Sequence, residues 1–234
     1  MDIDKIRAEV TSRFENAFMC EKIKEDGYSS FSYPKLVKMM KFDTIRHKVA
    51  GFGQIMSMRT KGPFGMRLLT MSFMPYEGGS VPYLLIDMMT VGKKITVFVE
   101  YYDCTADKSS KEELVRIKEK YDNLQEYDEK PKWYVPMRTP YSLIKCGQTV
   151  DSKSFYNMII DSVDAYISTV KASGKSADNI PGLSAFRDRM INEGNPSSSI
   201  LEKVFGKEGA EEFFKECVMP IRDFDSQIKF TNKE

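Results

Sequence analysis

The chain has 234 residues, 41% of them hydrophobic, so it can bury a full core, and we expect one domain over residues 1–234. Its 35 Lys and Arg residues nearly balance its 34 Asp and Glu residues, which leaves a formal net charge of +1. This balance excludes a global electrostatic attraction to nucleic acid or to a membrane surface, so any electrostatic recognition must be local.

The cysteine and histidine content argues against a metal site and a catalytic triad. The four cysteines are far apart and form no C-x-x-C pair: Cys20, Cys104, Cys146 and Cys217. The single histidine, His47, is expected to be exposed or packed rather than reactive. No apolar run approaches the ~18 residues of a membrane span, and the N-terminus lacks the pattern of a leader. We therefore expect a reduced, cytoplasmic protein without a metal, a nucleic-acid partner or a membrane partner.

The first half of the chain reads as a helix followed by strands. Apolar residues from Ile6 to Phe18 recur at near-helical spacing, which predicts a helix over residues 3–22. Short apolar or alternating runs separated by turn residues then predict a meander of antiparallel strands, at 55–60, 66–74, 82–89 and 94–103. Gly92 is expected to close a hairpin between the last two strands, because glycine takes the positive φ of a tight turn.

The second half reads as mainly helical. The charged stretch 107–130 predicts a solvated helix and loop, and residues 133–146 predict one more strand. Apolar residues on one face predict a helix over 153–171, and a shorter helix is expected at 185–191. Ser197 or Ser198 is expected to cap a last helix that ends at Gly206. Helix, strands and helices in this order predict a layered α+β fold.

One strand carries an acid. The segment "PYLLIDMM" (82–89) is apolar except for Asp87, and alternation places four residues on one face: Tyr83, Leu85, Asp87 and Met89. Loss of hydration there raises the pKa of the carboxyl group, which can then hold and donate a proton. The alternative is that Asp87 faces water or pairs with a Lys or Arg. Glu100 and Asp103 on the partner strand are expected to matter less, because they lie near its polar end.

Three segments resemble the ferredoxin-dependent bilin reductases. "LLTMSFMPYEGGSVPYLLIDMMTVGKKITVFVEYYDCT" (68–105) is similar to the strand-loop-strand core of that family, with Asp87 at the position of its catalytic aspartate. "PKWYVPMRTPYSLIKCG" (131–147) resembles its P-P-W segment. "NPSSSILEKVFGKEGAEEFFKECVMP" (195–220) resembles its C-terminal signature, which is the most specific of the three.

The resemblance implies a three-layer α/β/α sandwich with a central antiparallel sheet. It also implies a monomeric oxidoreductase that binds a linear tetrapyrrole, a biliverdin-like bilin, between the sheet and the C-terminal helices. No cofactor is implied, because electrons arrive singly from reduced ferredoxin, or flavodoxin, and the bilin passes through radical intermediates. The protein supplies protons through Asp87. The substrate-binding residues are expected to be Thr70, at a position where some members have histidine, with Leu85, Met89 and Asn195.

Other positions depart from the family pattern. Pro196 replaces an aspartate, Ser197 replaces a lysine that can meet a propionate, and Leu85 replaces a glycine. Two alternatives therefore stay open: a non-catalytic tetrapyrrole carrier or sensor, and an interaction protein that kept the fold without the ligand. The red chlorophyll catabolite reductases share the fold, so another open-chain substrate is a near alternative.

Basic residues suggest two further contacts. The candidate partners for substrate propionates are Lys130, Lys132, Arg187 and Arg189. A second basic run either forms a patch for an acidic ferredoxin or is an ordinary solvated face, and it consists of Lys35, Lys38, Lys41, Arg46 and Lys48.

Overall fold

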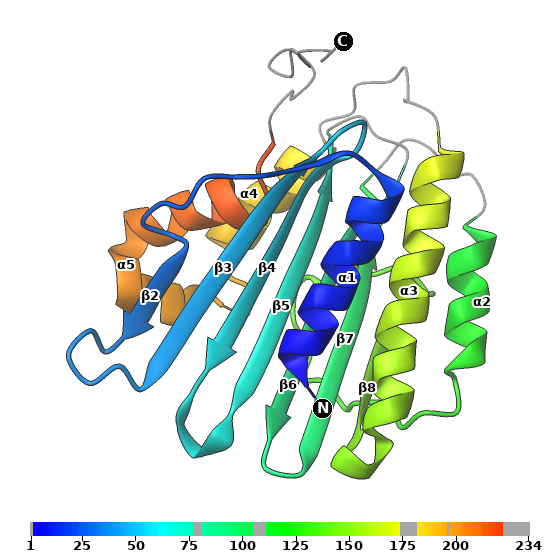
Figure 1. Ribbon diagram of the computed structural model, residues 1–234, viewed down its shortest axis with the longest axis horizontal. Coiled ribbons are helices and arrows are strands. Elements are labelled where there is room, and N and C mark those ends of the chain that lie inside the picture. The colour runs from blue at the N-terminus through cyan, green and yellow to red at the C-terminus, as the bar shows by residue number, and fades with distance from the viewer. Residues whose placement is uncertain (1, 77–80, 105–110, 174–181, 196, 222–234) are drawn as a thin grey trace.

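A single antiparallel sheet forms the middle layer of the molecule (Figure 1). The computed structural model describes residues 2–76, 81–104, 111–173, 182–195 and 197–221. Its eight strands are β1 (Cys20–Lys22), β2 (Ser30–Tyr33), β3 (Met40–Val49), β4 (Gly53–Lys61), β5 (Arg67–Pro75), β6 (Tyr83–Val91), β7 (Lys94–Tyr102) and β8 (Leu143–Gln148). The sheet order is β1-β3-β4-β5-β6-β7-β8, and β2 pairs with β3 outside this path.

Helices cover both faces of this sheet. One face carries α1 (Ile3–Ala17), α2 (Glu112–Lys120) and α3 (Ser152–Ala172), and the other carries α4 (Gly182–Asn192) and α5 (Ser198–Phe213) (Figure 1). A π-helical turn, η4 (Phe214–Val218), continues α5, and three short 3-10 turns are η1 (Pro63–Gly65), η2 (Val135–Met137) and η3 (Thr149–Asp151). The expected three-layer α/β/α sandwich is confirmed.

Two apolar cores lie on the two faces of the sheet. Strand β6 contributes to both of them, because its successive side chains point to opposite faces. Leu84, Ile86 and Met88 belong to the core shared with α1 and α3. Tyr83 and Leu85 belong to the core shared with α4 and α5. Because successive side chains of a strand point to opposite faces, Asp87 lies on the α4–α5 side. The face predicted for Asp87 from the sequence is therefore correct.

Two predicted helix boundaries are wrong. The first helix ends at Ala17, not at residue 22, because Cys20–Lys22 pairs with β3 as an edge strand. The last helix does not end at Gly206. Gly206 has a φ of 77° and breaks the helical path, but the chain resumes the helix and buries Ala210 and Phe213 against the sheet. The Gly92 hairpin is confirmed, with a φ of 57° at the glycine.

The predicted basic run separates into two environments. Lys35, Lys38 and Lys41 are exposed, whereas Arg46 is buried and forms an ion pair with Asp26. Arg46 therefore does not contribute to a surface patch. His47 is packed rather than open, with only 9% of its surface exposed, as expected. In the described part of the chain, no helix combines the length and the apolar character that crossing a bilayer demands.

Candidate functional site

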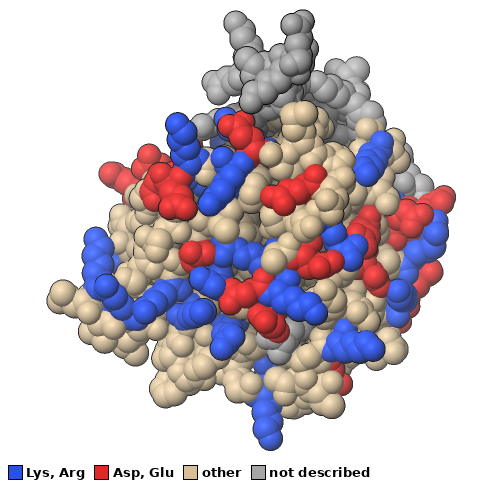
Figure 2. All heavy atoms as spheres, viewed as in Figure 1, with Lys and Arg blue, Asp and Glu red and all other residues tan. Residues whose placement is uncertain are grey.

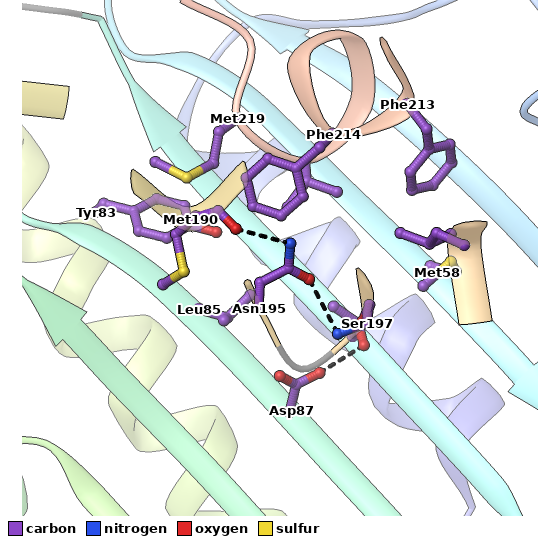
Figure 3. A pocket seen from close by; sticks show the side chains of 13 residues that line it. Met58, Tyr83, Leu85, Asp87, Met190, Asn195, Ser197, Phe213, Phe214 and Met219 are labelled. Carbon is purple, nitrogen blue, oxygen red and sulfur yellow. Dashed lines mark hydrogen bonds between the residues drawn. The ribbon is translucent and has the colours of Figure 1, made fainter. Parts of the chain in front are cut away.

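A small cavity lies between the sheet and the C-terminal helices, on the face that carries Asp87 (Figure 3). Its volume is about 30 Å³. The sheet contributes five lining residues, Met58, Thr70, Tyr83, Leu85 and Asp87. The opposite wall comes from α4, α5, η4 and the residues that follow α4 and η4, and consists of Met190, Asn195, Ser197, Leu201, Phe213, Phe214, Val218 and Met219.

Asp87 and Thr70 occupy directly opposite positions in the β5–β6 ladder, so their side chains point to the same face. The Thr70 hydroxyl donates a hydrogen bond to Asp87 Oδ1. Asp87 is the only carboxylic acid among the lining residues, and none of those residues is cationic. The alternative that Asp87 pairs with a nearby Lys or Arg is therefore not realised among the residues that the structure describes.

Loss of hydration sets the acidity of Asp87, whose side chain is partly buried. Loss of hydration raises the pKa of its carboxyl group to about 6, and the hydrogen bond from Thr70 opposes that shift because it stabilises the carboxylate. A group with this pKa exchanges its proton in the physiological range. In an apolar cavity it can act as a general acid toward a bound basic atom.

The wall formed by the α4–α5 connection is fixed by the side chain of Asn195. Its Nδ2 donates a hydrogen bond to the Met190 carbonyl at 3.2 Å, and its Oδ1 accepts one from the Ser197 backbone N–H at 3.0 Å (Figure 3). The Trp133 indole N–H donates to the carbonyl of the preceding Gly194 at 2.8 Å. Asn195 thus lines the cavity as expected, but both ends of its amide already hold the connection in place.

The end of the helical wall is tied to the sheet by two polar side chains. Gln54 Nε2 donates to the Cys217 carbonyl at 3.1 Å, and the Ser72 hydroxyl donates to the Val218 carbonyl at 2.5 Å. These carbonyls lie in the π-helical turn, which leaves backbone acceptors without helical partners. The two bonds hold Phe214 and Met219 over the cavity.

A second acid, Glu100, lies beside this site and is more deeply buried than Asp87, which is partly buried. It was expected to matter less than Asp87. Glu100 on β7 pairs in register with Leu85, so it shares the face of Asp87, and it is 3% exposed. It accepts hydrogen bonds from Tyr102 Oη at 2.8 Å and from Arg138 Nε at 2.5 Å. Arg138 also pairs with Glu129. The predicted hairpin at Gly92 already implies this pairing of Glu100 with Leu85. The position of Glu100 on the face of Asp87 could therefore have been predicted from the sequence.

The environment of Glu100 gives it an acidity close to neutral. Burial, together with the nearby charge of Asp87, raises the pKa of its carboxyl group to about 7, even though Arg138 acts to lower it. The charge of Asp87 on the neighbouring strand therefore disfavours ionisation of Glu100. Glu100 does not line the cavity, so its position suits a structural or electrostatic role.

Other predicted site residues lie elsewhere. Met89 shares the face of Asp87 but is 38% exposed at the end of the sheet and does not line the cavity. Pro196 lies outside the described residues. None of the candidate propionate partners lines the cavity: Arg187 pairs with Asp188, Arg189 pairs with Glu193 and stacks on Trp133, and Lys132 lies over Tyr134. Within the described residues, no cluster of three metal-ligating side chains occurs.

Comparisons with known proteins agree with the fold. No protein-family model matches the sequence, and no curated protein matches it. Among solved structures, the chain is similar to phytochromobilin synthase from tomato, which was crystallised in complex with biliverdin. The TM-score is 0.79, and the match covers 91% of this chain and 81% of that chain with 13% sequence identity. A match of this kind shows that the two chains share a fold.

Proposed function

We propose that this protein reduces an open-chain tetrapyrrole of the biliverdin type, with Asp87 as the proton donor and reduced ferredoxin, or flavodoxin, as the electron donor. The main support is Asp87 itself, an acid with a pKa of about 6 in an apolar cavity between the sheet and the C-terminal helices. The second support is the fold, which is shared with a tomato protein crystallised with biliverdin.

The proposed chemistry assigns one task to each side chain at the sheet. Reduction of one double bond of the bilin consumes two electrons from the donor protein and two protons. Asp87 gives a proton to the bilin as an electron arrives, and then regains one from solvent. The Thr70 hydroxyl stabilises the carboxylate left behind. Apolar neighbours such as Met58 and Leu85 limit access of water to the radical.

Binding of a tetrapyrrole requires the cavity to enlarge. Its volume of about 30 Å³ is far below the ~300–1,000 Å³ of typical small-molecule sites. In the proposed complex the helical wall moves away from the sheet and the side chains of Met190, Phe214 and Met219 turn aside. Two of these are methionines, whose flexible thioether side chains adapt readily to a new shape.

The decisive experiment is anaerobic titration of the protein with biliverdin, followed by addition of ferredoxin and a reducing system. We expect a shift of the visible spectrum on binding and conversion of the bilin on reduction. Asp87→Asn should bind the bilin but block turnover or trap a radical, because the amide cannot donate an acidic proton. Asp128→Asn, which changes an exposed acid, serves as the matched control. Full activity of Asp87→Asn would remove the central assignment.

A second candidate function is a non-catalytic tetrapyrrole carrier or sensor. It is favoured by the absence of a cation among the lining residues and by Ser197 at the place of the lysine of related enzymes. A spectral shift without conversion, for biliverdin and for other open-chain tetrapyrroles, would favour this function. Absence of a shift with all of them would favour an interaction protein that kept the fold alone.

A further inference from the structure

Four connections leave the same end of the sheet, at its lower edge in Figure 1. They are the β2–β3 loop, the β4–β5 hairpin, the β6–β7 hairpin and the β8–α3 connection. The ladder pairs that close this end are Lys41 with Lys61, Lys61 with Arg67, Arg67 with Thr90, and Lys94 with Gln148. We call the segments 34–41, 61–67, 89–94 and 148–153 the rim.

The rim presents large apolar side chains to solvent. Leu36 is 97% exposed, Phe64 is 94% exposed and Val150 is 86% exposed, and each belongs to a different connection. Four further members are Val37, Met39, Met89 and Val91. Elsewhere in the described residues, only Met19, Val115 and Tyr127 are exposed apolar side chains of this size. Seven of the ten large apolar side chains that are exposed in the described residues thus lie along one end of the sheet, and this concentration marks a surface that contacts a partner.

The rim is also strongly basic. Its segments contain eight basic residues, Lys35, Lys38, Lys41, Lys61, Arg67, Lys93, Lys94 and Lys153, and a single acidic residue, Asp151. All eight are exposed, and none forms an ion pair among the residues that the structure describes. Two acids at the start of α1 lie at the same end: Asp4 is paired with Arg59, and Asp2 caps the helix and lines a surface hollow together with Lys153. Figure 2 shows tan and blue atoms along this lower edge, with little red.

We propose that the rim docks on the surface of an anionic lipid bilayer. Leu36, Phe64 and Val150 enter the headgroup region, and the surrounding Lys and Arg side chains contact lipid phosphates. Apolar side chains bind at this depth by burial, and basic residues near an anionic surface add electrostatic attraction. A bilayer fits better than an acidic protein, because these apolar groups protrude singly from separate loops and a soft interface accepts them without a matching pocket.

The proposal is independent of the chemistry at Asp87, and it differs from the expectation drawn from total charge. A net charge of +1 predicts no attraction to a membrane surface. The fold, however, brings four basic segments from distant parts of the sequence to one end, so that the rest of the chain is left net acidic. Only the antiparallel register reveals this asymmetry.

The test is cosedimentation of the full chain with vesicles of phosphatidylcholine alone and of phosphatidylcholine with phosphatidylglycerol. We expect binding to the anionic vesicles only, weakened by added salt. The double variant Leu36→Ser/Phe64→Ser should lower the partition coefficient by roughly tenfold or more, because burial of both apolar groups is lost. Lys35→Glu/Lys38→Glu should lower it by a similar factor through charge. Met19→Ser/Val115→Ser is the matched control, since it removes exposed apolar groups elsewhere and should leave binding unchanged.

Several results would overturn the proposal. Failure of the unchanged chain to sediment with anionic vesicles is the first. The second is that both rim variants sediment with anionic vesicles as strongly as the unchanged chain does. If vesicles do not bind, while the rim variants lose affinity for reduced ferredoxin used as an acidic protein probe, the rim is a protein-docking surface instead. Because every substituted side chain is exposed, the variants should fold, which circular dichroism can verify.

Discussion

The Thr70 hydroxyl donates a hydrogen bond to the Asp87 carboxylate from the position directly opposite in the β5–β6 ladder. This bond lowers the pKa of Asp87, while burial raises it to about 6. Thr70→Val should therefore raise the pKa of Asp87, because the carboxylate loses its donor while burial is kept. Thr70→Ser, which keeps the hydroxyl, is the matched control. Carboxyl NMR as a function of pH measures the shift, and an unchanged pKa in Thr70→Val would contradict the role assigned to the hydroxyl.

Asp87 should make the folded state less stable as the pH rises. Its pKa is about 6 in the folded chain, against ~3.9 in an unfolded chain. Between these values the folded chain holds a proton that the unfolded chain has released, so the free energy of unfolding falls as the pH rises from about 4 to about 6. Below pH 4 both states are protonated and the penalty is absent.

Asp87→Asn removes that penalty, so this variant should be more stable than the unchanged chain above pH 7, by at most about 3 kcal/mol. The advantage should disappear near pH 4. Urea unfolding at pH 4 and pH 8 measures the difference, and Asp128→Asn should show no such pH dependence. A stability difference of the same size at both pH values would show that the carboxyl group is not held at a raised pKa.

Arg138 should stabilise the fold by neutralising the buried Glu100. Replacing Arg138 with Met leaves Glu100 buried without its cation, so we expect a loss of about 3–5 kcal/mol in the free energy of unfolding and a further rise in the pKa of Glu100. Adding Glu100→Gln should recover much of that loss. Arg116→Met breaks an exposed pair with Glu113 and should cost less than ~1 kcal/mol. Additive effects of the two buried changes in denaturant unfolding would argue against their coupling.

Leu85 should limit the size of the cavity. Leu85→Ala removes bulk from the cavity wall at a position where the bilin reductases have glycine, so we expect tighter binding of biliverdin together with a loss of about 2–5 kcal/mol in stability. Leu69→Ala removes an equal volume from the core on the opposite face and should reduce stability without changing binding. Spectral titration and urea unfolding separate the two effects. Equal affinity of both variants would show that Leu85 does not restrict the site.

The position of Asp87 was predictable because it depends on local geometry. Strand alternation fixed its face, and the three sequence segments fixed the order of the layers around it. Glu100 was not predicted as a site residue, although the Gly92 hairpin pairs it with Leu85, because it lies toward the polar end of its strand, where side chains are usually solvated. Its partner Arg138 lies in a segment that was predicted to be part of a strand over 133–146. That prediction is wrong for residues 133–142, which form irregular chain and a 3-10 turn, because the strand begins only at Leu143. The first helix was predicted too long because an apolar spacing continues past Ala17 into residues that pair as an edge strand.

The sequence by itself therefore determined the layered α+β architecture and a partly buried acid on one face of the sheet, because periods of two and of about 3.6 residues are written in local residue order. The tertiary structure alone decided how closely α4, α5 and η4 approach that acid, and it gathered the rim from four distant segments. These features depend on packing and on strand register between residues far apart in the chain, which no local pattern encodes.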